Sequence, residues 1–253
     1  MIYDWFIAHL NHLYYVGVAP RAYPNLAGQP RGDCPYKNYP IYSDALHIIH
    51  FIAAMEAFLF DAEVVKVLSR IAGKPLNQED LSPLVVFLTA LVVVLRGVIV
   101  IDRVVAIAEE KQLQNTLNSF LPAAGDLPQL IPLIVAGVEQ QQVYLSPIEL
   151  LVLTSPLSQS QKLLLLALGY QMSAADAEID VREQMYLQSI ANRLGIKPQH
   201  STTLSAGLTG HGHVDPKALT EVYTLLDPAR FQNLDPVFVQ VATNLRSALP
   251  AVS

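Results

Sequence analysis

The feature that most restricts the fold is an almost unbroken run of apolar residues, LVVFLTALVVVLRGVIVI, at positions 84–101. A run of this length approaches the roughly 20 residues that a transmembrane helix needs. Arg96 interrupts the run, however, and Asp102 and Arg103 follow it directly. Since an arginine near the middle of a span costs about 2.5 to 3.5 kcal/mol, the run predicts a helix buried inside a helical bundle and no transmembrane span. Association with a membrane surface is the alternative for this apolar half of the chain.

Two further segments have the same helical character. Residues 161–172, QKLLLLALGYQM, are apolar on nearly every side, which predicts a second central helix. After them, Leu187, Ile190 and Leu194 recur at the spacing of an amphipathic helix, and Gly195 then ends that helix. Because no segment shows the alternation that is typical of a strand, we expect an all-α fold, a helical bundle.

The composition of one short segment suggests how the chain is divided. Residues 154–160, TSPLSQS, are small, polar and proline-containing between two apolar stretches, as in a linker. We therefore predict two packed helical domains, 1–155 and 156–253. Within the first, residues 16–43 hold five prolines and four tyrosines, a composition that opposes both helix and sheet. This loop should pack as an ordered arm over the helical body, or else bind a partner.

Glycine and proline positions predict several helix boundaries. The apolar helix should continue to a point near Pro122, with a bend at Gly97. The Asp-Pro pairs at 215–216 and 235–236 both have the form of a helix start with proline in the first turn. Residues 200–213 are rich in glycine, serine and threonine, and we expect them to form a loop in which His211 and His213 are exposed to solvent.

A turn between the helices at 161–172 and 181–194 carries more carboxylates than a connector needs. Four acids lie within eight residues, and Arg182 is the only basic residue near them: Asp176, Glu178, Asp180 and Glu183. Alternate residues of a turn can direct side-chain oxygens at one centre, as Ca²⁺ or Mg²⁺ requires. The spacing is not that of an EF-hand, because a valine and a leucine occupy the positions of its glycine and its bidentate glutamate. We predict a turn that binds a partner or a divalent cation.

A purely structural role is the alternative for part of this turn. Asp180 and Glu183 have the spacing of a capping box, in which the first residue accepts from free amides of the following helix. Acids in a first turn also favour the positive end of the helix dipole. Capping leaves Asp176 and Glu178 unexplained, although solvated acids on a loop need no special role.

The residues around this turn resemble a known family. A helix ends in Ala-Ala-Asp, Glu-Ile-Asp follows, and the next helix opens with a glutamate and ends in Ile-Ala-Asn-Arg-Leu-Gly. This order is similar to the TerB-like domain of tellurite-resistance and related stress proteins, over roughly residues 158–249. The resemblance implies an all-helical bundle with an acidic surface that binds metal ions or partners, often in membrane-linked stress systems, and it implies no catalytic activity. The four acids match the family's acidic pattern, whereas Ala177 stands where the family usually has glycine.

Histidines form a second candidate site. His9 and His12 are three residues apart, as are His47 and His50, and both pairs fall in stretches with helical periodicity. Such spacing places two side chains on one helix face, so two packed helices could offer four imidazoles to a transition metal. Neither pair has the HExxH form of a hydrolytic zinc site. The alternative is that these are ordinary polar positions on partly buried helices.

Charge and composition exclude some classes of function. The formal net charge is −6, so the chain has no general attraction to nucleic acid, and we expect no nucleic-acid partner. Cys34 is the only cysteine, which excludes an intrachain disulfide and a cysteine-based zinc cluster. The first residues do not have the pattern of a signal peptide, so a cytoplasmic location is the default expectation.

No sequence motif of a common enzyme class is present, including GxSxG, GxxxxGK[ST] and GxGxxG. We therefore expect a non-enzymatic helical interaction or scaffold protein that binds a protein partner through the acidic turn. A metal-binding stress protein that uses the same acids is the first alternative. A metal-dependent enzyme that uses the histidine pairs is the second.

Overall fold

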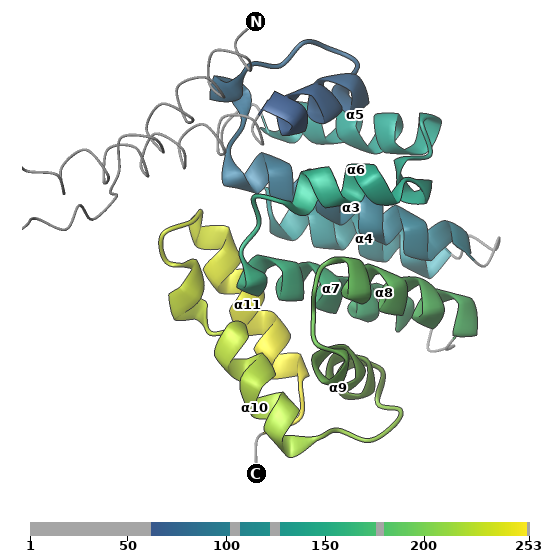
Figure 1. Cartoon of the computed structure of the whole chain (residues 1–253), viewed down its shortest axis with the longest axis vertical. Helices are drawn as coiled ribbons and strands as arrows, with labels where there is room; N and C mark the ends of the chain where they lie inside the picture. Colours follow the sequence, from purple (N-terminus) through teal and green to yellow (C-terminus); the bar gives the residue numbers. More distant parts are fainter. Residues whose placement is uncertain (1–61, 102–106, 122–126, 176–179, 252–253) are drawn as a thin grey trace, which may run out of the picture. The chain divides into compact units, whose positions relative to one another are not determined.

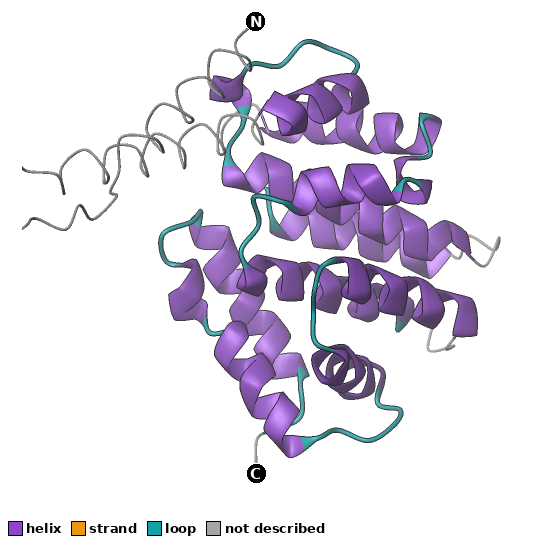
Figure 2. Cartoon of the chain, in the orientation of Figure 1, coloured by secondary structure: helices purple, strands orange, loops and turns teal. Residues whose placement is uncertain are grey.

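The computed structural model describes residues 62–101, 107–121, 127–175 and 180–251, and every structural statement below concerns these residues. Residues 62–72 are helical. The elements that follow are η1 (Gln78–Asp80), α3 (Pro83–Ile101), α4 (Ile107–Ser119), α5 (Leu127–Gln140), η2 (Val143–Leu145), α6 (Pro147–Thr154), α7 (Gln159–Ser173), α8 (Val181–Arg193), α9 (Pro198–Thr209), α10 (Pro216–Leu225), η3 (Pro228–Phe231) and α11 (Pro236–Ala248). No strand occurs in these ranges, and the predicted all-α helical bundle is confirmed (Figure 2).

The apolar run at 84–101 forms the central helix α3 (Figure 1). Every residue from Leu84 to Ile99 is buried except Arg96. Among the described helices α3 alone is long and apolar enough to cross a membrane, yet 83% of its most apolar window is buried inside the protein. It contacts α5, α6 and α8, and most extensively α7, which is also buried along most of its length. Both helices that were expected to be central are therefore core helices of the bundle.

Arg96 is held by ion pairs from two neighbouring helices. Its guanidinium contacts Glu110 of α4 and Glu139 of α5, and its side chain is 13% exposed. In one continuous helix, residues 96 and 110 would lie about 21 Å apart at 1.5 Å per residue. The prediction of one helix from the apolar run to Pro122 is thus wrong, because α3 ends at Ile101 and α4 returns alongside it.

Gly97 allows α3 and α8 to pack closely. It lies inside α3, which continues beyond it to Ile101. A Cβ atom at this position would overlap the phenol of Tyr186, a residue of α8. The glycine that we expected to mark a bend therefore marks the place where α8 approaches the backbone of α3.

An aromatic cluster joins the middle of the chain to its last helix. The ring of Phe87 on α3 lies 4.9 Å from that of Phe238 on α11 and 5.4 Å from that of Phe120 (centroid to centroid). The 154–160 segment is a short connection from α6 to α7, and Ser158 and Gln161 form a capping box there. The core thus contains residues from both sides of the division predicted between 155 and 156.

Residues 200–209 belong to a helix, so the prediction of a loop over 200–213 is wrong for this part. The composition indicated a loop because serine and threonine favour turns when their hydroxyls replace the backbone hydrogen bonds of a helix. In α9 the hydroxyls of Thr202 and Thr209 instead donate to carbonyls four residues earlier, at 3.0 and 2.7 Å. Burial of Leu204 and its neighbours then fixes the helix, which ends at Gly210 with a φ of +74°.

The two predicted Asp-Pro helix starts are confirmed. Asp215 accepts from the amide of Lys217 at 3.0 Å and begins α10, and Asp235 accepts from the amide of Val237 at 3.1 Å and begins α11. In each case the proline that follows occupies the first turn, where no backbone donor is needed.

Candidate functional site

The acidic turn lies only partly within the described residues. Asp176 and Glu178 fall outside them, so the prediction for these two acids stays open. Asp180 is the N-cap of α8, as expected from its position. Glu183, in the first turn of α8, is only 5% exposed.

Arg182 engages both carboxylate oxygens of Asp180. The backbone amide of Arg182 donates to Oδ1 at 2.6 Å, Nε donates to the same oxygen at 3.1 Å, and Nη2 donates to Oδ2 at 2.8 Å. These hydrogen bonds from the side chain and backbone of Arg182 lower the pKa of Asp180 to about 2. A cation bound by Asp180 would therefore compete with the guanidinium for the carboxylate oxygens.

Beyond the turn, α8 presents apolar side chains to solvent. Val181 is 67% exposed and Met185 is 68% exposed. They are four residues apart, so they share one face of the helix. Both border a groove of about 350 Å³ between α8 and α9. Exposed apolar side chains with polar neighbours are the arrangement found in many protein interfaces.

A buried hydrogen-bond network forms the floor of this groove. The hydroxyl of Ser201 donates to Oε1 of Gln188 at 3.2 Å and lies 2.8 Å from the hydroxyl of Tyr170. Because a serine hydroxyl has one proton, Tyr170 must be the donor to Ser201. Burial raises the pKa of Tyr170, and the bond to Ser201 opposes that rise. The phenol thus stays neutral and fixes α7 against α9 beneath the groove.

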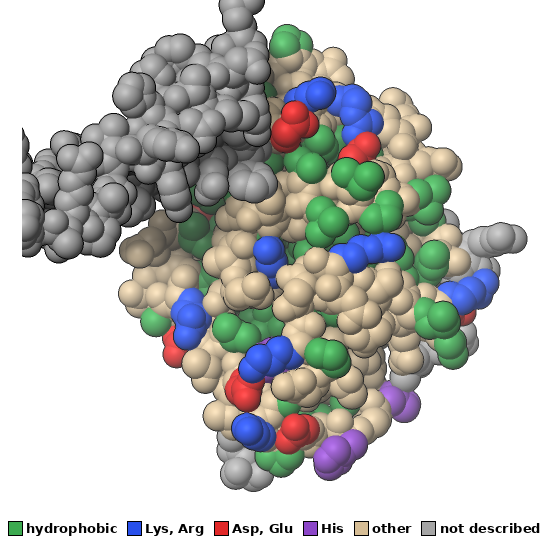
Figure 3. Space-filling model, in the orientation of Figure 1, with side chains coloured by type: hydrophobic (Ala, Val, Ile, Leu, Met, Phe, Trp, Pro, Cys, Tyr) green, Lys and Arg blue, Asp and Glu red, His purple; other side chains and the backbone are tan. Residues whose placement is uncertain are grey.

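The groove also includes two exposed histidines, His211 and His213, after the end of α9. Nδ1 of His211 lies 2.7 Å from the carbonyl oxygen of Thr209, so Nδ1 carries a proton and donates to this oxygen. Histidine side chains reach the surface near the lower end of the face in Figure 3. The expected solvent exposure of these two residues is confirmed.

The histidine pairs proposed as a metal site all precede the described part of the chain. His9, His12, His47 and His50 lie outside it, so that hypothesis stays a prediction. Within the described ranges, no group of three or more histidine, cysteine, aspartate or glutamate side chains is arranged to hold a metal ion.

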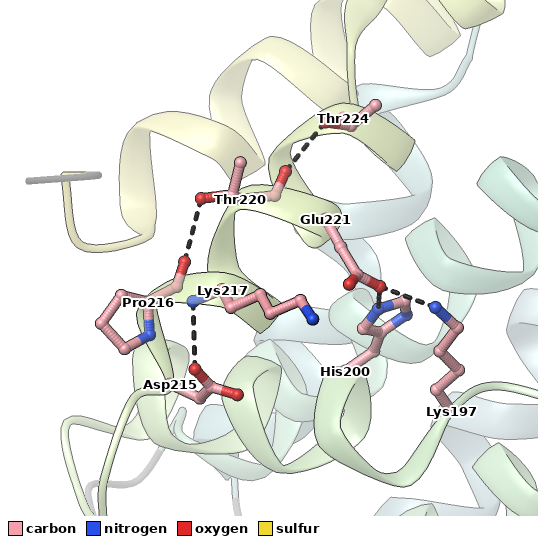
Figure 4. Close-up of polar contacts among 8 residues, drawn as sticks. All are labelled: Lys197, His200, Asp215, Pro216, Lys217, Thr220, Glu221 and Thr224. Carbon is pink, nitrogen blue, oxygen red and sulfur yellow. Dashed lines mark hydrogen bonds and ion pairs between the residues drawn. The ribbon is translucent and has the colours of Figure 1, made fainter.

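A second polar cluster connects α10 to the start of α9 (Figure 4). Oε2 of Glu221 accepts from Nζ of Lys197 at 2.7 Å and from Nε2 of His200 at 2.8 Å. The hydrogen bonds from Lys197 and then His200 lower the pKa of Glu221 to about 2. His200 is only 4% exposed, and an ionised Glu221 requires its Nε2 to carry the proton. We call these three residues the Lys197–His200–Glu221 triad.

Comparison with protein families decides how this bundle is classified. Residues 88–206 match the model of the family described as tellurite resistance protein TerB. This part of the chain is a TerB-like domain. No curated protein and no solved structure matches the chain.

The TerB-like domain begins earlier than the resemblance suggested. It includes most of α3 and crosses the division predicted between 155 and 156. The acidic turn and the whole of α8 lie within it, whereas α10 and α11 follow it. The triad therefore joins the TerB-like domain, through Lys197 and His200, to a helix beyond its end, through Glu221.

Sequence reasoning missed this triad because it assigned His200 to a loop. One signal could have found two of its members, Lys197 and His200. Lys197 is followed by Pro198 shortly after Gly195, which is the pattern of one helix ending and another beginning with proline in its first turn. A helix that starts there places residues 197 and 200 one turn apart, on the same face.

Proposed function

We propose that the chain is a non-enzymatic interaction protein whose TerB-like domain binds a protein partner through the outer face of α8. The observation that carries this proposal is the exposure of Val181 and Met185, about two-thirds each, beside a groove. The described part of the TerB-like domain thus has an apolar patch directly after its acidic turn. The description of the family, tellurite resistance, favours a role in stress response.

The chemistry of this face suits a protein partner. Apolar anchors inside a polar rim supply most of the binding energy in many interfaces. Here Gln184 and Ser205 line the groove beside the anchors and can pair with a peptide backbone. The acids of the turn would attract a basic segment of the partner and raise its association rate.

The test places a negative charge at exposed apolar positions on α8 and at a matched exposed position on another helix. A partner recovered by affinity purification is produced separately and titrated against Val181→Asp, Met185→Asp and the control Ile148→Asp. Ile148 is 74% exposed on α6 and does not line the groove beside α8. We expect at least about a tenfold loss of affinity for the two α8 variants and none for the control. Equal affinity for all three proteins would refute the proposal.

Cation binding at the acidic turn is the alternative function. Calorimetric titration of metal-stripped protein with Ca²⁺, Mg²⁺, Mn²⁺ and Zn²⁺ separates the candidates. Saturable binding that is lost in the Asp176→Asn, Asp180→Asn double variant would favour a metal-binding stress protein. Binding that survives in this variant would favour the histidine pairs and a metal-dependent enzyme.

The location that accords best with an interaction protein of this kind is the cytoplasm or the surface of a membrane.

A further inference from the structure

A pocket of about 400 Å³ lies where the start of α7, the connection from α8 to α9 and the end of α10 meet. Its volume is within the range of about 300 to 1,000 Å³ that is usual for small-molecule sites. Leu163, Ile196 and Leu225 supply apolar lining, and the Lys197–His200–Glu221 triad supplies the polar lining. Such a pocket suits a small ligand with an apolar body and a few polar groups.

The triad leaves unused hydrogen-bonding capacity at the pocket. Oε2 of Glu221 already accepts from both Lys197 and His200, whereas Oε1 has no partner among the described residues. The ammonium of Lys197 has three N–H bonds, and Glu221 is its one side-chain partner in the same part of the chain. Oε1 and Oε2 belong to the same carboxylate of Glu221, and Oε2 is bonded to Nζ of Lys197. The free acceptor Oε1 and the spare N–H donors of Lys197 are therefore neighbours.

Charge balance restricts the ligand further. Lys197 and Glu221 form an ion pair at 2.7 Å, so their opposite charges cancel. A ligand of net charge would bring an uncompensated ion beside Leu163 and Ile196, which is unfavourable. A zwitterion adds no net charge and can offer a donor to Oε1 and an acceptor to the ammonium together.

We propose that this pocket binds a small zwitterion with an aliphatic side chain, that is, an α-amino acid of the leucine type. Its ammonium group donates to Oε1 of Glu221, and its carboxylate accepts from Nζ of Lys197. The aliphatic side chain covers Leu163, Ile196 and Leu225. An α-amino acid fits because both charged groups are attached to one carbon atom. This site is separate from the α8 face and does not depend on the function proposed for that face.

The first test is a titration of the full chain with L-leucine, followed by calorimetry or by amide chemical shifts. Three analogues each lack one element: leucinamide lacks the carboxylate, 4-methylpentanoate lacks the ammonium group, and glycine lacks the side chain. We expect saturable binding of leucine and affinities at least about tenfold weaker for every analogue. No saturable binding of leucine, or an analogue that binds equally well, would overturn the proposal.

Variants test the assigned residues. Glu221→Gln keeps an acceptor for Lys197 and His200 but removes the charge, and Lys197→Met keeps the aliphatic stem but removes the ammonium. The control is Glu149→Gln. In the wild type the carboxylate of Glu149 pairs with Arg70 at 2.6 Å, and neither residue lines this pocket. Leucine affinity should fall at least about tenfold in the first two proteins and stay unchanged in the control. Unchanged leucine affinity in Glu221→Gln and Lys197→Met would mean that leucine binds elsewhere and would overturn the proposal. If a variant fails to fold, the analogue series on the wild-type protein still tests it.

Discussion

Two tyrosines whose hydroxyl groups lie inside the protein show that removal of a hydroxyl can either lower or raise stability. Tyr170 bonds to Ser201 at 2.8 Å, whereas the hydroxyl of Tyr186 is buried without a hydrogen-bond partner among the described residues. A buried polar group without a partner costs about 1 to 3 kcal/mol. Removing the first hydroxyl therefore breaks a bond, and removing the second relieves a cost.

We accordingly expect Tyr170→Phe to lower the free energy of unfolding by about 1 to 2 kcal/mol and Tyr186→Phe to raise it by about 1 kcal/mol. Urea denaturation followed by circular dichroism measures both. Destabilisation of the two variants by the same amount would mean that the Tyr186 hydroxyl has a partner after all.

The pH dependence of stability tests the charge on Glu221. Hydrogen bonds from Lys197 and His200 hold its pKa at about 2 in the folded chain, below its ordinary value of 4.5. A lowered folded-state pKa means that the contribution to stability is complete above pH 4.5 and is lost as the pH falls toward 2.

In Glu221→Gln this component should be absent, so its midpoint of urea denaturation should fall less steeply than that of the wild type over this range. Glu63→Gln is a suitable control, because Glu63 is exposed and its contact with Lys66 is 3.9 Å long. Identical profiles for wild type and Glu221→Gln would contradict the assigned pKa.

At the scale of helices, the Arg96 ion pairs hold α3 against α4 and α5. The guanidinium is largely buried, whereas the carboxylates of Glu110 and Glu139 are 39% and 41% exposed. Loss of both carboxylates would leave a buried charge without compensation, while loss of the arginine would leave two carboxylates that water can reach.

The Glu110→Gln, Glu139→Gln double variant should thus lose about 2 to 4 kcal/mol of stability. Addition of Arg96→Met to this background should recover part of the loss, because methionine suits the apolar surroundings. Chemical denaturation of the three proteins provides the comparison, and a further loss in the triple variant would contradict this explanation.

Helices were predictable from sequence where a local rule decided them, and not where tertiary contacts did. Asp215 and Asp235 cap helices as their Asp-Pro pairs indicated, because capping involves only neighbouring residues. The separation of α3 from α4 and the role of Gly97 depend on Glu110 and Tyr186, which approach from other helices. Likewise, α9 forms because its hydroxyls bond within the helix and its apolar face is buried, and composition alone did not indicate this.

The same reasoning explains what was predictable of the candidate site. The cap at Asp180 followed from its position, but its engagement by the guanidinium of Arg182 did not. The exposure of Met185 could not be deduced, since a methionine on an amphipathic helix is usually assigned to the core. Glu221 lies 21 residues after His200, a separation without a local signal.

At the scale of the whole molecule, the core joins regions that the sequence analysis placed in separate domains. Phe238 of α11 packs on Phe87 of α3, and α7 packs along α3. A fragment of residues 156–253 would expose the faces that contact α3. We expect this fragment to lack a cooperative thermal transition, whereas residues 62–253 should retain one. Cooperative unfolding of the shorter fragment would instead support two independent domains.

The measurement that tests the central claim most directly is site-specific photo-crosslinking in cells, with the photoreactive residue at position 185 on α8 or at position 148 on α6. Both native side chains are about 70% exposed or slightly more, so accessibility alone does not distinguish them. A partner bound on the α8 face predicts a discrete crosslinked product from position 185 that disappears with Val181→Asp, and none from position 148. Crosslinks of equal yield from the two positions, or a product from position 185 that persists with Val181→Asp, would contradict the account.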